Sequence, residues 1–261
     1  MIKEKILENG YLDDDYKIMI EKIIKENKAI FEILYKYNKF LYKIQSEFNN
    51  YSMNLETNYH FSMFIQIHKL YQSAIIMIQY GLLESFESIL RNILESAVNI
   101  LYSLIDNKNI MILELDSINE NLKKLNYIDD KKIFDVISKE KVDEYRKQKE
   151  EERANIIKEI GDAKKPKTMD LFRTINFEKE YLYYRCLCDY THMNSNIAGR
   201  IVKQETDGFI FDGGPNYLDI NNESARLIGT IELFIDKFIK KYSPNLIEEY
   251  KALEKEADAL N

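Results

Sequence analysis

The sequence is poor in the residues that make tight turns. It has 8 glycines and 3 prolines in 261 residues, and no tryptophan. β-Sandwiches and barrels need many tight turns, which usually contain Gly, Pro or Asn-Gly. Apolar residues make up 45% of the chain and charged residues 31%, so a sizeable core is available and a disordered chain is excluded. These totals predict long helices joined by few corners.

The chain also lacks the features of secreted, membrane-spanning and strongly basic proteins. Its two cysteines, Cys186 and Cys188, would point about 200° apart on a helix, so they neither bridge nor share a metal there, which fits a reducing compartment. The longest uncharged run, residues 70–83, is shorter than the roughly 20 residues that span a bilayer. The N-terminus has no apolar signal core. We therefore expect a cytoplasmic protein without a membrane association.

The net charge argues against a general affinity for nucleic acid. The formal value is −7, and the sequence pI is near 5.3. Such a field repels phosphates, so a protein of this charge binds nucleic acid only through a local basic site.

Hydrophobic periodicity predicts a single all-α domain over residues 1–261, a bundle of about seven to nine helices. We expect one long amphipathic helix within residues 1–50, a core over residues 52–205 that includes a helix at residues 178–196, and C-terminal helices over residues 221–261. The centre of the core is residues 66–105, either two helices that meet near Gly81 or one long bent helix. A small irregular or hairpin segment is expected near residues 206–220, with strands at Phe209–Phe211 and Tyr217–Leu218.

Charged residues within these helices are interpreted first as structural. Residues 138–160 mix both signs, which is typical of a solvated helix, although a helix that docks a partner has the same pattern. Arg91 and Glu95 are four apart and can form an ion pair on one helix face, or support a nearby site. His60 and His68 are eight apart and lack the spacing of a helical metal pair, so we interpret them as packing or surface residues.

The run from Tyr184 to Asn196 carries the most specific chemistry. Arg185 and His192 are seven residues apart, so on a helix they lie about 20° apart in azimuth and roughly 10.5 Å apart along the axis. A phosphate fits between a long arginine and an imidazole placed in this way. The same stripe would continue with a carboxylate, an amide, a phenol and an amine, from Asp189, Asn196, Tyr181 and Lys203.

These residue types suit cleavage of a phosphodiester without a metal or cofactor. Arg185 keeps its charge, grips phosphate oxygens at two points and would stabilise the extra negative charge of the transition state. His192 titrates near neutrality, so it can take a proton from a ribose 2′-hydroxyl or give one to the leaving oxygen. Asp189 would orient the imidazole. Because the 2′-hydroxyl of RNA is an internal nucleophile, we expect RNA rather than DNA as substrate.

The spacing of Arg185, Tyr190 and His192 resembles the signature of HEPN-superfamily ribonucleases, particularly their toxin branch. The wider context, Tyr184 to Asn194, and the upstream Leu90–Glu95 are similar to an uncharacterised bacterial family of helical proteins. The resemblance implies an all-helical, metal-independent endoribonuclease, commonly a homodimer in which two copies of the motif face each other. It implies roles in antiphage defence or toxin–antitoxin pairs, with an antitoxin partner or a nucleotidyltransferase that modifies Tyr190.

The resemblance also assigns roles to single residues. Two departures from the family stand beside it: Cys186 follows the arginine where a polar residue is common, and the chain is longer than a minimal HEPN domain. Arg91 and Glu95 would support the site from outside. The residues expected in the site are Arg185 and His192 as catalytic groups, Asp189 and Tyr190 as supporting groups, and Asn194 or Asn196 as substrate contacts.

The same residues have a second explanation, which is purely structural. Arg185 and Asp189 would form an ordinary salt bridge at helix spacing, and His192 would be a buried histidine near a helix end. The protein would then be a non-catalytic helical interaction or regulatory module, a kind that the HEPN superfamily also contains. The catalytic hypothesis requires Arg185 and His192 to reach one solvent-open cleft.

Overall fold

The computed structural model describes residues 14–134, 138–191, 202–205, 208–211 and 219–260. Over these residues the protein is an all-α helical bundle with one two-stranded hairpin, which confirms the predicted fold class. The chain divides into two compact units, residues 1–98 with 178–261, and residues 99–177. The single all-α domain expected over residues 1–261 stays a prediction.

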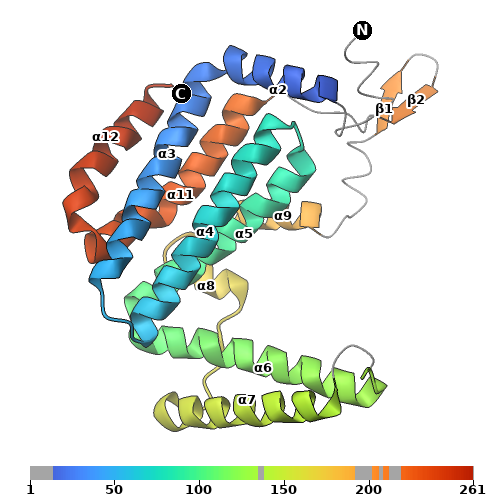
Figure 1. Cartoon of the computed structure of the whole chain (residues 1–261), viewed down its shortest axis with the longest axis vertical. Coiled ribbons are helices and arrows are strands. Elements are labelled where there is room, and N and C mark those ends of the chain that lie inside the picture. Colours follow the sequence, from blue (N-terminus) through green and yellow to red (C-terminus); the bar gives the residue numbers. More distant parts are fainter. Residues whose placement is uncertain (1–13, 135–137, 192–201, 206–207, 212–218, 261) are drawn as a thin grey trace. The chain divides into compact units, whose positions relative to one another are not determined.

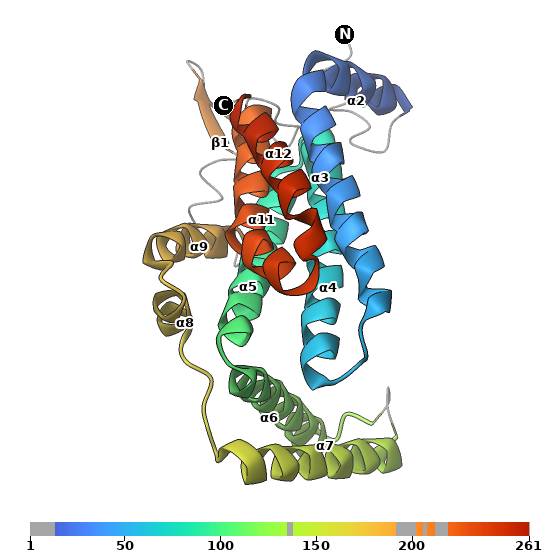
Figure 2. The same ribbon diagram turned by 90° about the vertical axis from the view of Figure 1, so that its left-hand side faces the viewer.

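The core of the first unit lies between long helices that pack side by side. Helix α3 contacts α4, α11 and α12, and α11 also contacts α4 (Figures 1 and 2). Phe64 of α4 stacks on Phe238 of α11 with ring centroids 4.7 Å apart. The α-helices of this unit are α2 (Asp14–Glu26), α3 (Lys28–Glu47), α4 (Leu55–Gln79), the first part of α5 (Leu83–Ile105), α9 (Glu178–Thr191), α11 (Ile220–Tyr242) and α12 (Ile247–Asp258).

The second unit contains the end of α5, then α6 (Asn107–Lys131), α7 (Lys139–Ile160) and α8 (Thr168–Thr174). Helices α6 and α7 pack against each other (Figure 1). Val142 is the one buried residue of α7, so the charged stretch is the solvated helix that its composition predicted. Among the described residues, no helix is long and apolar enough to cross a membrane.

The prediction of one long N-terminal helix within residues 1–50 is wrong, because this segment forms two helices, α2 and α3. Helices α2 and α3 are separated at Asn27, whose φ and ψ are −111° and 32°. The Ile23 carbonyl accepts both the Asn27 side chain at 2.9 Å and the Asn27 backbone N–H at 3.0 Å, so the side-chain bond is added to the helix bond at the break. This break accounts for a total of ten α-helices in the described residues, where about seven to nine were expected.

The hairpin lies slightly earlier than expected. Strand β2 (Gly208–Phe211) pairs antiparallel with β1 (Val202–Glu205), with Val202 opposite Phe211 and Glu205 opposite Gly208. The predicted partner, Tyr217–Leu218, lies outside the described residues. The two strands are separated by two residues, the shortest hairpin connection, which is why the nearer segment is the partner.

Helices α4 and α5 are two helices that meet at Gly81, as the first of the two alternatives predicted. Gly81 has a φ of 63°, in the left-handed region that favours glycine. Its N–H donates to the Ile78 carbonyl at 3.1 Å, and the Leu82 N–H donates to the Met77 carbonyl at 2.9 Å. This pair of bonds is the Schellman motif, which ends α4.

The left-handed turn predicts opposite effects for two glycine substitutions. Gly81→Ala should lower the free energy of unfolding by about 1 kcal/mol, because alanine is strained at a positive φ. Gly229→Ala in α11 should raise it by about 0.5–1 kcal/mol, because a Cβ there meets no atom within 4 Å and alanine favours helix. Urea unfolding of the two variants and the wild type measures both effects. Equal stability of the two variants would contradict the prediction.

Candidate functional site

Helix α9 carries the predicted motif, and one of its sides is buried. Leu187 is fully buried and Tyr184 is 6% exposed. Successive residues advance about 100° around a helix, so Tyr183, Leu187 and Tyr184 fall within one arc of about 100°. Arg185 lies about 100° beyond Tyr184 and is exposed. The helix therefore anchors itself on the tyrosines and leaves Arg185 toward solvent.

The structure describes the positions of only some of the predicted site residues. Asp189 is half-buried on α9, about 40° from Arg185 in azimuth. Arg185 forms no ion pair with another residue that the structure describes. Tyr190 belongs to α9, but its side chain is outside the description. The remaining predicted site residues, His192, Asn194 and Asn196, lie outside the described residues, and their convergence with Arg185 stays a prediction.

Arg91 joins α5 to α9 beside the motif. Its Nη2 donates to the Tyr184 hydroxyl at 2.9 Å, and its Nε donates to Cys188 Sγ at 3.4 Å. The guanidinium carbon lies 5.2 Å from the centre of the Tyr184 ring, a cation–π distance. Glu95 pairs with Arg91 at 3.2 Å, which confirms the predicted ion pair. Arg91 and Glu95 thus support the helix that carries Arg185.

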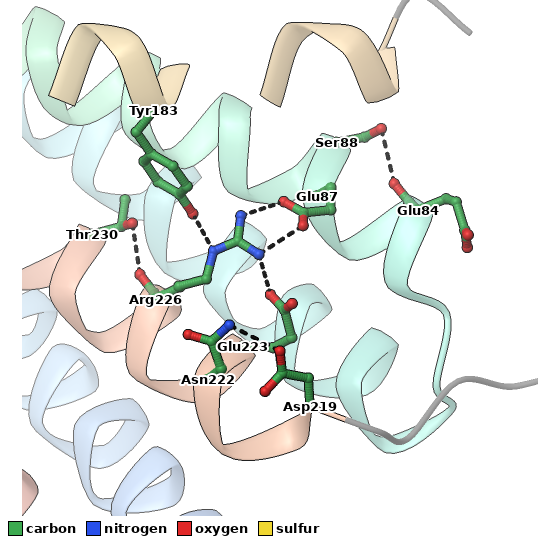
Figure 3. Close-up of polar contacts among 9 residues, drawn as sticks. All are labelled: Glu84, Glu87, Ser88, Tyr183, Asp219, Asn222, Glu223, Arg226 and Thr230. Carbon is green, nitrogen blue, oxygen red and sulfur yellow. Dashed lines mark hydrogen bonds and ion pairs between the residues drawn. The ribbon is translucent and has the colours of Figure 1, made fainter. Parts of the chain in front are cut away.

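A second arginine, Arg226 of α11, lies at the centre of a buried polar cluster that sequence analysis missed (Figure 3). Its Nε donates to the Tyr183 hydroxyl at 2.9 Å, and its two terminal nitrogens hold both carboxylate oxygens of Glu87 at 2.7 and 2.6 Å. The Nη1 atom of Arg226 also donates to Glu223 Oε2 at 2.5 Å. Glu87 and Glu223 are 4% and 5% exposed. The cluster therefore connects α5, α9 and α11 through one charge.

The cluster contains one more carboxyl group than it has cations. Burial raises the pKa of Glu223 to about 7, although the Arg226 guanidinium beside it favours the ionised form. Burial also raises the pKa of the Tyr183 hydroxyl above its ordinary value, so this group stays protonated near neutrality. The one sequence signal for the cluster was Glu87 among the apolar residues of its helix. The sequence pattern did not indicate which basic residue would pair with Glu87.

The other two histidines in the sequence are packing residues, as predicted. His60 Nδ1 lies 2.5 Å from the Tyr242 hydroxyl, and burial lowers the pKa of His60 to about 4. His68 Nε2 lies 2.9 Å from Asn38 Oδ1. Both cysteines are free, with Cys186 exposed and Cys188 half-buried. No group of three or more metal-ligating side chains occurs among residues with described positions.

A polar groove of about 610 Å³ occurs in the second unit, away from the predicted motif in sequence. Its lining contains four acidic and four basic residues, so it has no excess of positive charge for a phosphate. Lys165 pairs with Asp116 at 3.5 Å, and Arg153 pairs with Asp162 at 3.6 Å. These pairs favour a structural role for the groove.

Comparison with known proteins gives a family but no activity. The model of a family of unknown function, DUF5677, matches residues 57–209, more than half of the chain. The protein is thus an all-α protein, and it belongs to the DUF5677 family. The matched range includes Arg91, Arg185 and His192 but ends before Glu223 and Arg226. No curated protein and no solved structure matches the chain.

The Glu223 cluster predicts a pH-dependent contribution to stability. Between its ordinary pKa of 4.5 and about 7, the native carboxyl holds a proton that the unfolded chain has released, so the free energy of unfolding falls as pH rises. His60 has the opposite effect between about 4 and 6.5, because the unfolded chain binds the proton there. The two contributions oppose each other in the wild type.

Comparison with Glu223→Gln isolates the carboxyl group. Between about pH 5 and pH 8 the variant should gain up to about 3 kcal/mol relative to the wild type, because it has no proton to release. Urea unfolding at several pH values measures this difference. The exposed Glu249, which pairs with Lys43, gives the control Glu249→Gln, which should follow the wild type within about 0.5 kcal/mol. A constant difference between Glu223→Gln and wild type would contradict the assignment.

Proposed function

We propose that the protein is a metal-independent endoribonuclease of the HEPN type, with Arg185 as the phosphate-binding residue and His192 as general acid and base. The observation that supports this most is the exposure of Arg185 on a helix whose opposite side is fixed by Tyr183, Tyr184 and Leu187. A guanidinium on the exposed side of an anchored helix is accessible to an anion, and it can bind two phosphate oxygens at once.

The proposed reaction is an internal transesterification of RNA. The ribose 2′-oxygen attacks the adjacent phosphorus as His192 takes the 2′-hydroxyl proton, and the bond to the 5′-oxygen breaks. The leaving 5′-oxygen receives a proton from the imidazolium of His192, which returns His192 to its neutral form and gives a 2′,3′-cyclic phosphate and a 5′-hydroxyl end. Arg185 would stabilise the extra negative charge on the phosphoryl oxygens. Asp189 and Tyr190 would orient these groups, and Asn194 or Asn196 would contact the substrate.

The biological setting that we propose follows the same resemblance. A homodimer would bring two copies of the motif together, and each copy would add one Arg185 to a shared basic site. Antiphage defence or a toxin–antitoxin pair is the proposed role. An antitoxin or a nucleotidyltransferase that modifies Tyr190 is the proposed partner. A non-catalytic interaction module is the alternative that the experiment below distinguishes.

RNA cleavage in the presence of EDTA tests the proposal. His192→Ala should lower the cleavage rate about 10²–10⁴-fold, the usual effect of losing a general acid–base group. Arg185→Ala should lower it about 10²–10³-fold, while Arg185→Lys should retain part of the rate because the charge remains. End-group analysis should find 2′,3′-cyclic phosphates.

Arg173 provides the matched control for the loss of an exposed arginine. It lies on α8, is 57% exposed at its side chain and pairs with Asp170 of the same helix. Arg173→Ala should cleave RNA at the wild-type rate. Equal cleavage by wild type, His192→Ala and Arg185→Ala would refute the proposal. Absence of cleavage by the wild type, with a folded protein, would favour the interaction module.

A further inference from the structure

Two successive tyrosines of α9 are each held by an arginine from a different helix. Tyr183 accepts a hydrogen bond from Arg226 of α11, whose guanidinium carbon lies 5.0 Å from the ring centre. Tyr184 accepts one from Arg91 of α5, whose guanidinium carbon lies 5.2 Å from its ring centre. The two contacts have the same design, with one N–H to the hydroxyl and the cation near the ring.

These two contacts fix how α9 is rotated about its own axis. Neighbouring side chains on a helix point about 100° apart, so the two arginines approach α9 from different directions. The fully buried Leu187 lies between the two tyrosines in azimuth, and its apolar packing is less directional than a hydrogen bond. Two hydrogen-bonded contacts at different azimuths therefore restrict rolling in either sense. Arg185 is the next residue along the chain, so its direction is set by the tyrosine pair.

Both arginines are themselves held in place by carboxylates. Arg226 has its bidentate partner Glu87 and a further bond to Glu223, and the side chains of these glutamates are only 6% and 7% exposed. Arg91 pairs with Glu95, and the side chain of Arg91 is 18% exposed. A bidentate or multiply bonded guanidinium has little rotamer freedom. The tyrosines are thus held by groups that cannot easily move.

We propose that Arg91 and Arg226 are positioning residues, which fix the rotation of α9 through Tyr184 and Tyr183 and so set the direction of Arg185. The effect on RNA cleavage rests on the proposed function. The effect on α9 itself does not, because it follows from the two contacts alone. A measurement of α9 without RNA therefore separates the two proposals.

The chain has a built-in reporter for this measurement. Its only two cysteines are Cys186 and Cys188, and both lie on α9. In a Cys186→Ser background, the half-buried Cys188 is the single thiol, so its reaction with an aromatic disulfide reagent reports the position of α9. Tyr183→Phe is the informative substitution. It removes the hydroxyl that Arg226 holds, and it leaves the contact between Arg91 and Cys188 untouched.

Tyr71→Phe is the matched control. Tyr71 is a buried tyrosine of the same unit whose hydroxyl donates to the Leu34 carbonyl at 2.9 Å, away from α9 in sequence. Both substitutions remove one hydroxyl bond, so a similar fall in melting temperature is expected for both. Tyr183→Phe and Arg226→Lys should each raise the reaction rate of Cys188 about fivefold, the factor that corresponds to the loss of one hydrogen bond. Tyr71→Phe should leave this rate within about twofold of the background.

Cleavage kinetics complete the test. Tyr183→Phe should lower kcat about tenfold while KM stays within about twofold, because a misdirected Arg185 loses transition-state contacts first. If Cys188 reacts equally fast in Tyr183→Phe and Tyr71→Phe, the positioning proposal is wrong. If the thiol rates change as expected but the wild type cleaves no RNA, the rotation of α9 is set as proposed and the ribonuclease proposal fails. An unchanged kcat in an active enzyme overturns the role toward Arg185.

Discussion

The Arg226 guanidinium is the interaction on which the arrangement of the first unit depends. A charge in a helical core is strongly unfavourable unless it is paired and hydrogen-bonded. Arg226 therefore requires Glu87 from α5, Glu223 from its own helix and the Tyr183 hydroxyl from α9. Apolar packing brings these helices together without choosing one rotation. The N–H donors of a planar guanidinium point in fixed directions, so their hydrogen bonds favour one rotation of each helix.

The fold class could be predicted from the sequence because turn-forming residues are scarce and apolar positions follow the helical period. Because glycines are scarce, Gly81 within an apolar stretch also indicated a possible junction between two helices. The break at Asn27 was not predictable, since the apolar pattern continues across it and only the backbone angles of this one residue leave the helical range. The hairpin was expected about where it occurs, but its register depends on the length of the connection. The two residues between the strands are Thr206 and Asp207, which lack the Asn-Gly or Asp-Gly pair that signals such a connection.

The candidate site was predictable only in part. Spacing on a helix identified Arg185 as a candidate phosphate-binding residue, and its exposure became known only from the structure. The Arg91–Glu95 pair followed from a separation of four residues. The contact of Arg91 with Tyr184 joins residues 93 positions apart, and that of Arg226 with Glu87 joins residues 139 positions apart. Local patterns carry no information about such pairs. These pairs become apparent only in the folded structure, where helices from distant parts of the sequence lie side by side and a buried charge needs a partner.

The extent of the family match has a consequence for what counts as a complete domain. Residues 57–209 contain α5, α9 and all but the first two residues of α4. Helices α3 and α11, which pack against α4, both come from outside this range. Glu87 would lose Arg226 there, leaving a buried carboxylate without the counter-charge that holds it. In this protein, therefore, the helices that flank the matched stretch supply both the apolar cover of α4 and the counter-charge of Glu87.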